Sequence, residues 1–489
     1  MAKVLFISTG FTGLSTVPTA PALFHSILKN AGHTMCLFDT AFYKELSENV
    51  IDRREETGEV RETDLAELNS LMIKTGTAKE DLTDLITRFC PDVIMISLTE
   101  SMYDQVVKIL EYTSPYHILT VLGGVFPTVM PEFMLSHTGV DIVCVGEGEN
   151  AVTELCGRLD KGHDYRDISN LYVKEKNGDV VKNPHLPPVD INTLPVPDYS
   201  LFQEYRFYRP MAGTLYKMLT MDTGRGCYYK CSYCSSGVQY GGGPIRMKTV
   251  DKIYRDISAC VKRHSFNFIF FCTDNFLTIS ETEFDEFIEM YSSIKLPFFM
   301  QTCAETVTEN KIKRLRDIGL FRMAFAIEHG NEEFRKKVLN KPIKNNVIER
   351  AAEIIHAADL PLGLSVSNMV GLPLENRELA MDTITFNHSI AKYVDGMSCY
   401  IFKPFHGTPL RKLAVDMGFL SDATIASGAL SDASLLDIPG FNKAEIAGLR
   451  KCFSLYTRFD KSRWPEIRQA ESDDKLFGKL MEEYRELYF

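Results

Sequence analysis

The sequence has no run of apolar residues that approaches the roughly 18–20 needed for a membrane-spanning helix. It also lacks a surplus of positive charge, because 54 lysines and arginines face 65 aspartates and glutamates, a formal net charge of −11. A nucleic-acid partner is therefore disfavoured, since such proteins present a basic face to phosphates. Met1 to Ser8 lack the charged, apolar and small-residue regions of a secretory leader. We expect a cytoplasmic protein without a membrane span or a nucleic-acid partner.

Cysteine is present in number but not in the pattern of a disulfide framework. Most of the 12 cysteines are scattered along 489 residues, as expected of thiols in a reducing compartment. Three are clustered with C-x3-C-x2-C spacing: Cys227, Cys231 and Cys234. Iron–sulfur cubanes normally take four thiolates, so three in one loop predict a cluster with one open iron. The alternative, a zinc site, would need a fourth cysteine or histidine nearby.

Residues 1–165 alternate short apolar runs with helical stretches. Strands are expected at 4–8, 33–39, 92–98, 118–122 and 140–145. Such a pattern predicts a flavodoxin- or Rossmann-like parallel sheet that binds ligands at the carboxyl ends of its strands. The residues at those ends are Ser97, Leu98, Thr99, Gly123, Gly124, Phe126, Pro127, Gly146, Glu147 and Gly148. Alone, they could form a nucleotide site or plain turns.

Three further segments flank or interrupt the predicted domains. A helical insertion at about 45–90 is expected to be solvated and to cover the sheet edge, with a lid or a partner surface as the alternative. Residues 166–212 read as a hairpin, turning at Asn177-Gly178, and a semi-rigid proline-rich connector. Residues 416–489 read as a mostly helical carboxyl-terminal cover.

Residues 213–415 contain six strand–helix units, which predict a parallel, partly open (β/α)6 barrel. Strands are expected at 215–221, 268–272, 298–302, 322–327, 363–369 and 396–402. Ligands would bind at the carboxyl ends of these strands. The candidate residues there, apart from the cysteines, are Asp274, Asn275, Glu305, Glu328, Gly371 and Pro373.

The cysteine motif, with Tyr233 before its last cysteine, resembles that of the radical S-adenosylmethionine (SAM) superfamily. The strand-end motifs follow in the order of that superfamily, among them Glu328-His-Gly330, Gly371-Leu-Pro373 and Pro404-Phe-His-Gly407. The first domain, with its G-G-x-x-P-T and G-E-G-E motifs, resembles the cobalamin-binding domain found in one subgroup, the class B radical SAM methyltransferases.

This resemblance implies a ligand for each candidate set. The three cysteines would hold a [4Fe-4S] cluster, and the strand-end residues from 97 to 148 would bind cobalamin. SAM would contact Tyr233, Asp274, Asn275, Glu305, Glu328, Gly371 and Pro373. The D-x-H-x-x-G motif is absent, so cobalamin would be base-off without a histidine ligand, and His25 and His33 are expected to be structural. Cys272, Cys303, His329 and His406 are also expected to have structural roles.

The resemblance also implies a reaction, a carbon methylation. A 5′-deoxyadenosyl radical would activate an unactivated carbon, and methylcobalamin would supply the methyl group. A flavodoxin or ferredoxin would act as electron donor. The substrate stays open between a peptide or protein side chain, a small metabolite and a lipid. The alternatives are a cobalamin-dependent radical SAM cyclase or ring-rearranging oxidoreductase, and a non-catalytic sensor that binds cobalamin or a cluster.

Overall fold

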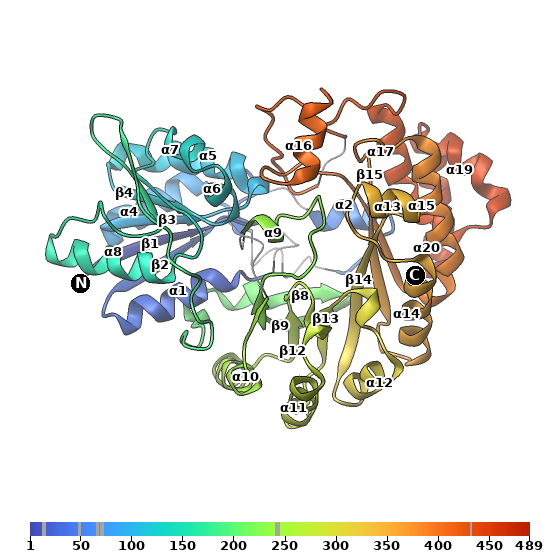
Figure 1. Cartoon of the computed structure of the whole chain (residues 1–489), viewed down its shortest axis with the longest axis horizontal. Helices are drawn as coiled ribbons and strands as arrows, with labels where there is room; N and C mark the ends of the chain where they lie inside the picture. Colours follow the sequence, from blue (N-terminus) through green and yellow to red (C-terminus); the bar gives the residue numbers. More distant parts are fainter. Residues whose placement is uncertain (12–15, 47–49, 65–67, 69–72, 240–244, 431–432) are drawn as a thin grey trace.

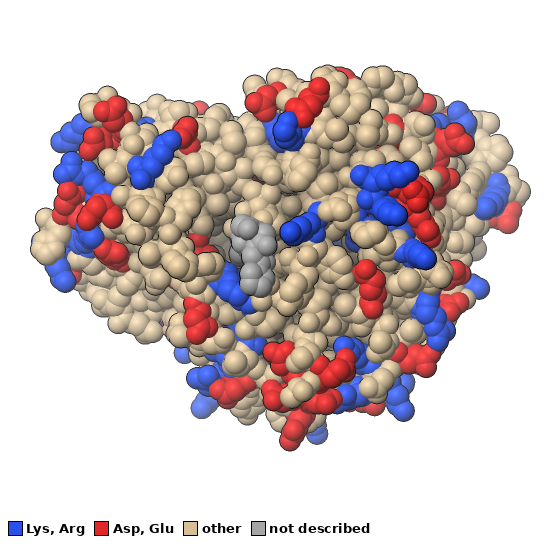
Figure 2. All heavy atoms as spheres, viewed as in Figure 1, with Lys and Arg blue, Asp and Glu red and all other residues tan. Residues whose placement is uncertain are grey.

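The computed structural model contains two seven-stranded sheets that lie beside each other (Figure 1). It describes residues 1–489 except 12–15, 47–49, 65–67, 69–72, 240–244 and 431–432. In the described part of the chain, no helix is long and apolar enough to cross a membrane. Acidic and basic side chains are interspersed on the face seen in Figure 2, which presents no continuous basic surface.

The first sheet is the predicted parallel sheet with two added strands. Its strands, in sheet order, are β2 (Thr34–Asp39), β1 (Lys3–Ser8), β3 (Val93–Ser97), β4 (Leu119–Gly123), β5 (Ile142–Cys144), β6 (Leu171–Lys174) and β7 (Val180–Lys182). The first five are parallel, and the β6–β7 hairpin, which the sequence assigns to the connector, extends the sheet antiparallel. Val4 and Phe6 are buried on one face while Leu5 and Ile7 are buried on the other, so both faces are covered.

Helices cover both faces of this sheet. They are α1 (Thr19–Asn30), α4 (Ala78–Phe89), α5 (Tyr103–Thr113), α6 (Val125–Val129), α7 (Pro131–Leu135) and α8 (Glu149–Lys161). The buried side chains of α4 and α5 pack in the cluster of Leu5 and Ile7, and those of α8 pack in the cluster of Val4.

The second sheet is the expected partial barrel. Its strands, in sheet order, are β16 (Gly396–Ile401), β15 (Leu364–Val370), β14 (Leu320–Glu328), β13 (Phe298–Gln301), β12 (Phe268–Phe271), β9 (Thr214–Met221) and β8 (Tyr208–Met211). Six are parallel, as predicted, and β8 adds an antiparallel edge.

Helices line the outer face of the barrel. They are α10 (Val250–His264), α11 (Glu281–Tyr291), α12 (Glu309–Asp317), α13 (Glu332–Lys337), α14 (Asn345–Ala357), α15 (Arg377–Ile390) and α16 (Pro409–Asp416). The side chains of Thr249, Ser280, Thr308 and Asn376 accept hydrogen bonds from backbone N–H groups in the first turns of α10, α11, α12 and α15. These caps fix where each helix begins after its strand.

The carboxyl-terminal helices pack on the outer side of the barrel. They are α17 (Lys443–Lys451), α18 (Phe453–Arg458), α19 (Trp464–Ala470) and α20 (Asp474–Tyr488). Leu449 and Phe453 lie against Val370 and Cys399, whose neighbours Ser398 and Tyr400 face the barrel interior. The loop before these helices crosses to the first domain instead, where the Gly428 N–H donates to the Ser101 carbonyl.

The insertion reaches the barrel, which contradicts the expectation of a solvated segment at the sheet edge. Arg54 on α2 (Val50–Glu56) donates to the Ser398 hydroxyl on β16 at 3.1 Å. Further along, a side-chain atom added at Gly213, in the β8–β9 turn, would lie 3.9 Å from the Glu62 carbonyl oxygen. The described part of the insertion therefore crosses between the two edges of the open barrel.

A buried acid joins the first domain to the segments after β16. Glu100 is only 4% exposed, and its carboxylate accepts hydrogen bonds from the His406 N–H at 2.7 Å and the Ala426 N–H at 2.8 Å. The His406 Nδ1 lies 2.8 Å from the same carboxylate. His406 is thus a structural residue, as expected from the sequence.

We predict that Glu100→Gln destabilises the protein by about 3 kcal/mol, because the amide loses acceptor capacity while its buried partners remain. Urea unfolding followed by far-ultraviolet circular dichroism measures this change. Glu111→Gln is the matched control, since Glu111 is exposed on α5 and the substitution removes the same charge. Equal unfolding midpoints for the two variants would contradict the role assigned to Glu100.

Candidate functional site

The three clustered cysteines follow β9 and face the inside of the barrel. Cys227, Cys231 and Cys234 line one cavity of about 480 Å³. The Ser236 N–H donates to the Cys234 Sγ at 3.4 Å, and burial raises the pKa of all three thiols.

The geometry of these cysteines differs from that of a structural zinc site. Among the described residues, no three His, Cys, Asp or Glu side chains converge as they would around a single metal ion. An iron–sulfur cubane is bound one thiolate to each iron corner and does not need its ligands to meet at one point. Three thiols that share a cavity without converging therefore fit a cluster better than a zinc ion.

Glu328 ends β14 at the rim of this cavity. Its φ of +70° is unusual for a residue other than glycine, and strained backbone of this kind gathers at functional sites. The Tyr233 hydroxyl donates to the Glu328 carboxylate at 2.8 Å, and the Lys341 Nζ lies 3.8 Å from it. Burial, followed by the charge of Glu328, raises the pKa of Tyr233, which keeps the phenol protonated. A carboxylate, a phenol and an ammonium thus meet beside the cysteines.

Asp274 follows β12 and borders two cavities. It accepts a hydrogen bond from the Ser236 hydroxyl at 2.5 Å, and burial raises its pKa. Its neighbour Asn275 braces the next strand end, because its Oδ1 accepts from the Thr302 hydroxyl at 2.7 Å and the Cys303 N–H at 3.3 Å.

The remaining predicted SAM residues do not line the cavity of the cysteines. Glu305 accepts from the Tyr229 hydroxyl at 3.0 Å, outside the cavity wall. The Gly371 N–H donates to the Glu375 carboxylate at 2.6 Å, in the turn that also contains Pro373. A side-chain atom added at Gly371 would meet Ile446 of α17 at 3.0 Å, so this turn is covered by the carboxyl-terminal helices.

Three residues expected to be structural have defined surroundings. His329 is fully buried, stacks on Phe334 and lies 3.2 Å from Glu375, away from the cavity. Cys303 does line the cavity, and burial raises its pKa to about 12. Cys272 lines the second cavity, and burial likewise raises its pKa to about 12.

The second cavity, of about 330 Å³, lies at the carboxyl edge of the first sheet. Of the residues predicted to bind cobalamin, those that line it are Ser97, Gly123, Gly124, Gly146, Glu147 and Gly148. Leu98, Thr99, Phe126 and Pro127 do not, and Phe126 is fully buried beside His406. Asp274 lines this cavity as well as the first, so the two meet at its carboxyl group.

Histidine is missing from the described lining of the second cavity. The His25 Nδ1 lies 3.2 Å from the Asp198 carbonyl oxygen, and the His33 Nδ1 accepts from the Ala2 N–H at 3.2 Å. The lining thus combines glycines, apolar side chains such as Leu23 and Phe24, and charged side chains such as Glu147 and Arg225. These residues fit part of a large ring ligand that needs no histidine. Residues 12–15 of the first loop lie outside the described chain.

Glu147 makes ion pairs across the domain boundary. Its carboxylate lies 3.0 Å from the Arg225 guanidinium and also pairs with Arg246. Burial opposes ionisation of Glu147, but these two arginines outweigh it and lower its pKa. Arg225 pairs with Glu149 too, at 2.7 Å. Arg225 lies two residues before Cys227, so these pairs fix the cysteine loop against the first domain.

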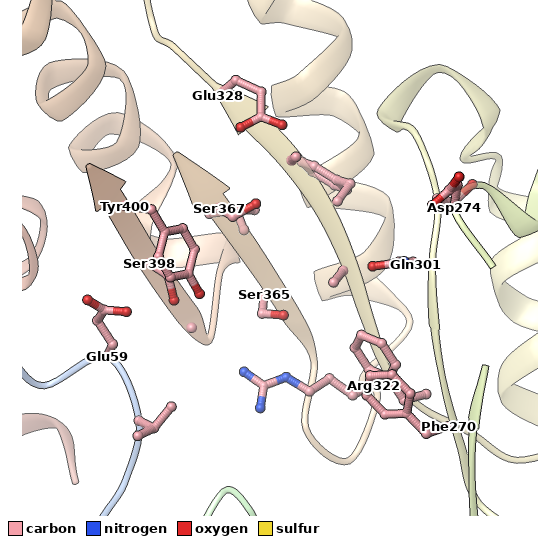
Figure 3. A pocket seen from close by; sticks show the side chains of 18 of the residues that line it. Glu59, Phe270, Asp274, Gln301, Arg322, Glu328, Ser365, Ser367, Ser398 and Tyr400 are labelled. Atoms are coloured by element: carbon pink, nitrogen blue, oxygen red, sulfur yellow. The ribbon is translucent and has the colours of Figure 1, made fainter. Parts of the chain in front are cut away.

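The sequence analysis missed the charged residues at the far end of the first cavity. Arg54, Arg209 and Arg322 line it there. Figure 3 shows Arg322 with Ser365, Ser367 and Ser398, which also line the cavity. The alternation of small residues along β14, β15 and β16 could have indicated this end of the cavity, since alternate strand residues face the interior.

Comparisons with known proteins agree with this arrangement. The radical SAM superfamily model matches residues 221–386, and the B12 binding domain model matches residues 55–156. A protein of Pyrococcus horikoshii described as an uncharacterized methyltransferase is 27% identical over 345 residues, covering 68% of this chain and 72% of its own. The cytidylyl-2-hydroxyethylphosphonate methyltransferase of Streptomyces wedmorensis is 20% identical over 441 residues, covering 81% and 80%.

A solved structure has the same fold over the whole length of both chains. It is the radical S-adenosylmethionine methyltransferase TsrM of Kitasatospora setae, solved with cobalamin and a [4Fe-4S] cluster, with 14% identity and a TM-score of 0.67. The two domains of this chain imply an iron–sulfur cluster, SAM and cobalamin as its cofactors. The chain is a radical SAM enzyme with a B12-binding domain, related to cobalamin-dependent methyltransferases.

Proposed function

We propose that the protein transfers a methyl group from SAM, by way of cobalamin, to an unactivated carbon of its substrate. The observation that carries this proposal is the shared wall at Asp274, where the cavity of the cysteines meets the cavity of the first sheet. Groups bound in the two cavities would be neighbours, as a reaction that uses both requires. An external one-electron donor of the flavodoxin or ferredoxin type would supply electrons.

The side chains of this chain have positioning roles in the proposal. Cys227, Cys231 and Cys234 would hold the cluster, which supplies one-electron chemistry to SAM while cobalamin supplies methyl transfer. Glu328 would accept hydrogen bonds from SAM, with Tyr233 fixing the orientation of its carboxylate. Asp274 would face the ligands of both cavities.

For cobalamin we propose a base-off state without a histidine ligand. The support is the lining of the second cavity, whose described residues include glycines and apolar side chains but no histidine. Glu147 would act indirectly, because its carboxylate is committed to Arg225 and Arg246. A base-off absorption spectrum of the protein loaded with cobalamin would support this mode, and a spectrum with a nitrogen base bound would refute it.

We predict that replacing Cys227, Cys231 and Cys234 together by alanine abolishes cluster binding. Iron and sulfide, measured after anaerobic reconstitution, should fall from about four of each per chain to near zero, since the cubane loses all its thiolates. Cys90→Ala, which removes an exposed thiol, is the matched control.

Cys303→Ala tests whether the cluster keeps an open iron. Cys303 lines the same cavity, yet we expect this variant to retain iron and sulfide, because a fourth thiolate would close the position that SAM needs. A cluster that persists in the triple variant, or that is lost from Cys303→Ala, would refute the assignment of the ligands.

We predict that SAM carrying a deuterated methyl group gives a product heavier by that group, together with 5′-deoxyadenosine. Mass spectrometry of reactions with candidate substrates measures both. Reactions of the triple cysteine variant serve as the control. Release of 5′-deoxyadenosine without a gain of methyl mass would favour a cyclase or a ring-rearranging oxidoreductase, and failure to release it would favour a sensor.

A further inference from the structure

The barrel interior is open because many inward-facing side chains on β14, β15 and β16 are small. Inward positions alternate along each strand, and on β14 they are Arg322, Ala324, Ala326 and Glu328. On β15 and β16 they are Ser365, Ser367, Gly396, Ser398 and Tyr400. A closed barrel would be filled by layers of branched side chains. Here the cavity runs down the strands from Glu328, beside the cysteines, to Arg322 (Figure 3).

Arg322 extends its guanidinium into the deep end of this cavity (Figure 3). It forms no ion pair within the described chain, and its Nε is buried without a hydrogen-bond partner. Burial lowers the pKa of Arg322 to about 10. The negative charge of Asp395 raises this pKa, and the positive charges of Arg54 and Arg61 lower it further. The Asp395 Oδ2 itself accepts a hydrogen bond from the Leu364 N–H at 2.9 Å. The positive charge of Arg322 is therefore only partly compensated.

The side chains around Arg322 also carry more positive than negative charge. Four arginines line the deep end (Arg54, Arg61, Arg209 and Arg322), against two glutamates (Glu55 and Glu59). Glu59 is already held by Arg54 at 3.4 Å and by Arg450 at 3.3 Å. Arg209 lies over the Phe270 ring at 5.1 Å, and burial followed by the charges of Arg206 and Arg54 lowers its pKa to about 10. Arg61 is exposed, whereas burial lowers the pKa values of Arg209 and Arg322. A buried cation such as Arg322 is costly unless an anion joins it.

We infer that the substrate carries an oxyanion, a carboxylate or a phosphate, that pairs with Arg322 at the deep end of this cavity. The inference rests on the proposed function, whose substrate class it narrows. The planar guanidinium suits both groups, because it donates two parallel hydrogen bonds to adjacent oxygens. The hydroxyls of Ser365 and Ser367 and the amide of Gln301 line the same space and supply neutral donors.

The position of Arg322 separates this subsite from the cysteines. Glu328 lies six residues after Arg322 on β14, which corresponds to roughly 20 Å along the strand. A SAM molecule beside the cysteines and Glu328 would leave the arginine end free. Gly396 makes room for the guanidinium, since an added Cβ would lie 2.5 Å from the Arg322 Nη2.

We predict that the holoenzyme, kept anaerobic and without SAM, binds inorganic phosphate, acetate or both. Isothermal titration calorimetry measures each anion separately, and the anion with the higher affinity indicates the group that the substrate carries. Arg322→Gln should weaken binding tenfold or more, because a charge-assisted pair is lost. Arg322→Lys should bind with intermediate affinity, since it keeps the positive charge but loses the paired donors of the planar guanidinium.

Arg255→Gln is the matched control, because Arg255 is exposed and pairs with Asp251 at the surface. It should bind as the wild type does. Wild-type protein that binds neither anion would overturn the inference, as would Arg322→Gln protein with undiminished affinity. If Arg322→Gln fails to fold, Gly396→Ala decides: its added methyl displaces the guanidinium, so full affinity in that variant also counts against the inference.

This measurement is independent of turnover. Protein that binds anions but transfers no methyl group would refute the proposed function alone. Protein that transfers methyl groups but binds no anion would refute the oxyanion subsite alone.

Discussion

The functional centre depends on the ion pairs of Arg225 with two acids of the first domain. Glu147 and Glu149 both lie within 3.0 Å of its guanidinium, at the carboxyl edge of the first sheet. Because Arg225 lies beside Cys227, the same residue fixes the cysteine loop and the strand ends of the B12-binding domain. All three side chains are largely buried, so solvent screens these pairs weakly. They hold the two cavities in contact at Asp274.

The insertion and the edge strand β8 form one wall of the barrel cavity, on the side that a six-stranded half-barrel leaves open. Arg54 reaches β16, the backbone at Glu62 lies near the β8–β9 turn, and Gly58 packs against Tyr484 of α20. A segment of the first domain therefore closes the barrel of the second. Changes in the insertion would alter the barrel cavity directly, although its residues are distant in sequence from every strand of the barrel.

The sequence predicted the parts of the structure that local pattern determines. Apolar runs separated by helices specified the parallel strands, and the cysteine spacing specified the loop between them. Prediction from the sequence failed where tertiary packing determines which segments lie together. Nothing near Arg54 indicates that the insertion crosses to β16, because the contact joins residues 344 apart. Gly371 follows its motif, yet α17 covers the turn. Arg322 reads as an ordinary strand residue until neighbouring strands place serines and Gly396 around it.

The charges of the barrel cavity also orient what enters it. Its cysteine end has the carboxylates of Glu328 and Asp274 with one ammonium, that of Lys341, and its deep end has four arginines with two glutamates. An anionic group would be attracted more strongly to the deep end, and inside a protein this preference is stronger than in water. A substrate bound by its oxyanion at Arg322 would direct its uncharged part toward Glu328. A radical reaction needs no charged group on the carbon it attacks. Placing the recognition charge far from the cysteines therefore separates binding from chemistry, and leaves Glu328 and Asp274 free to bind SAM.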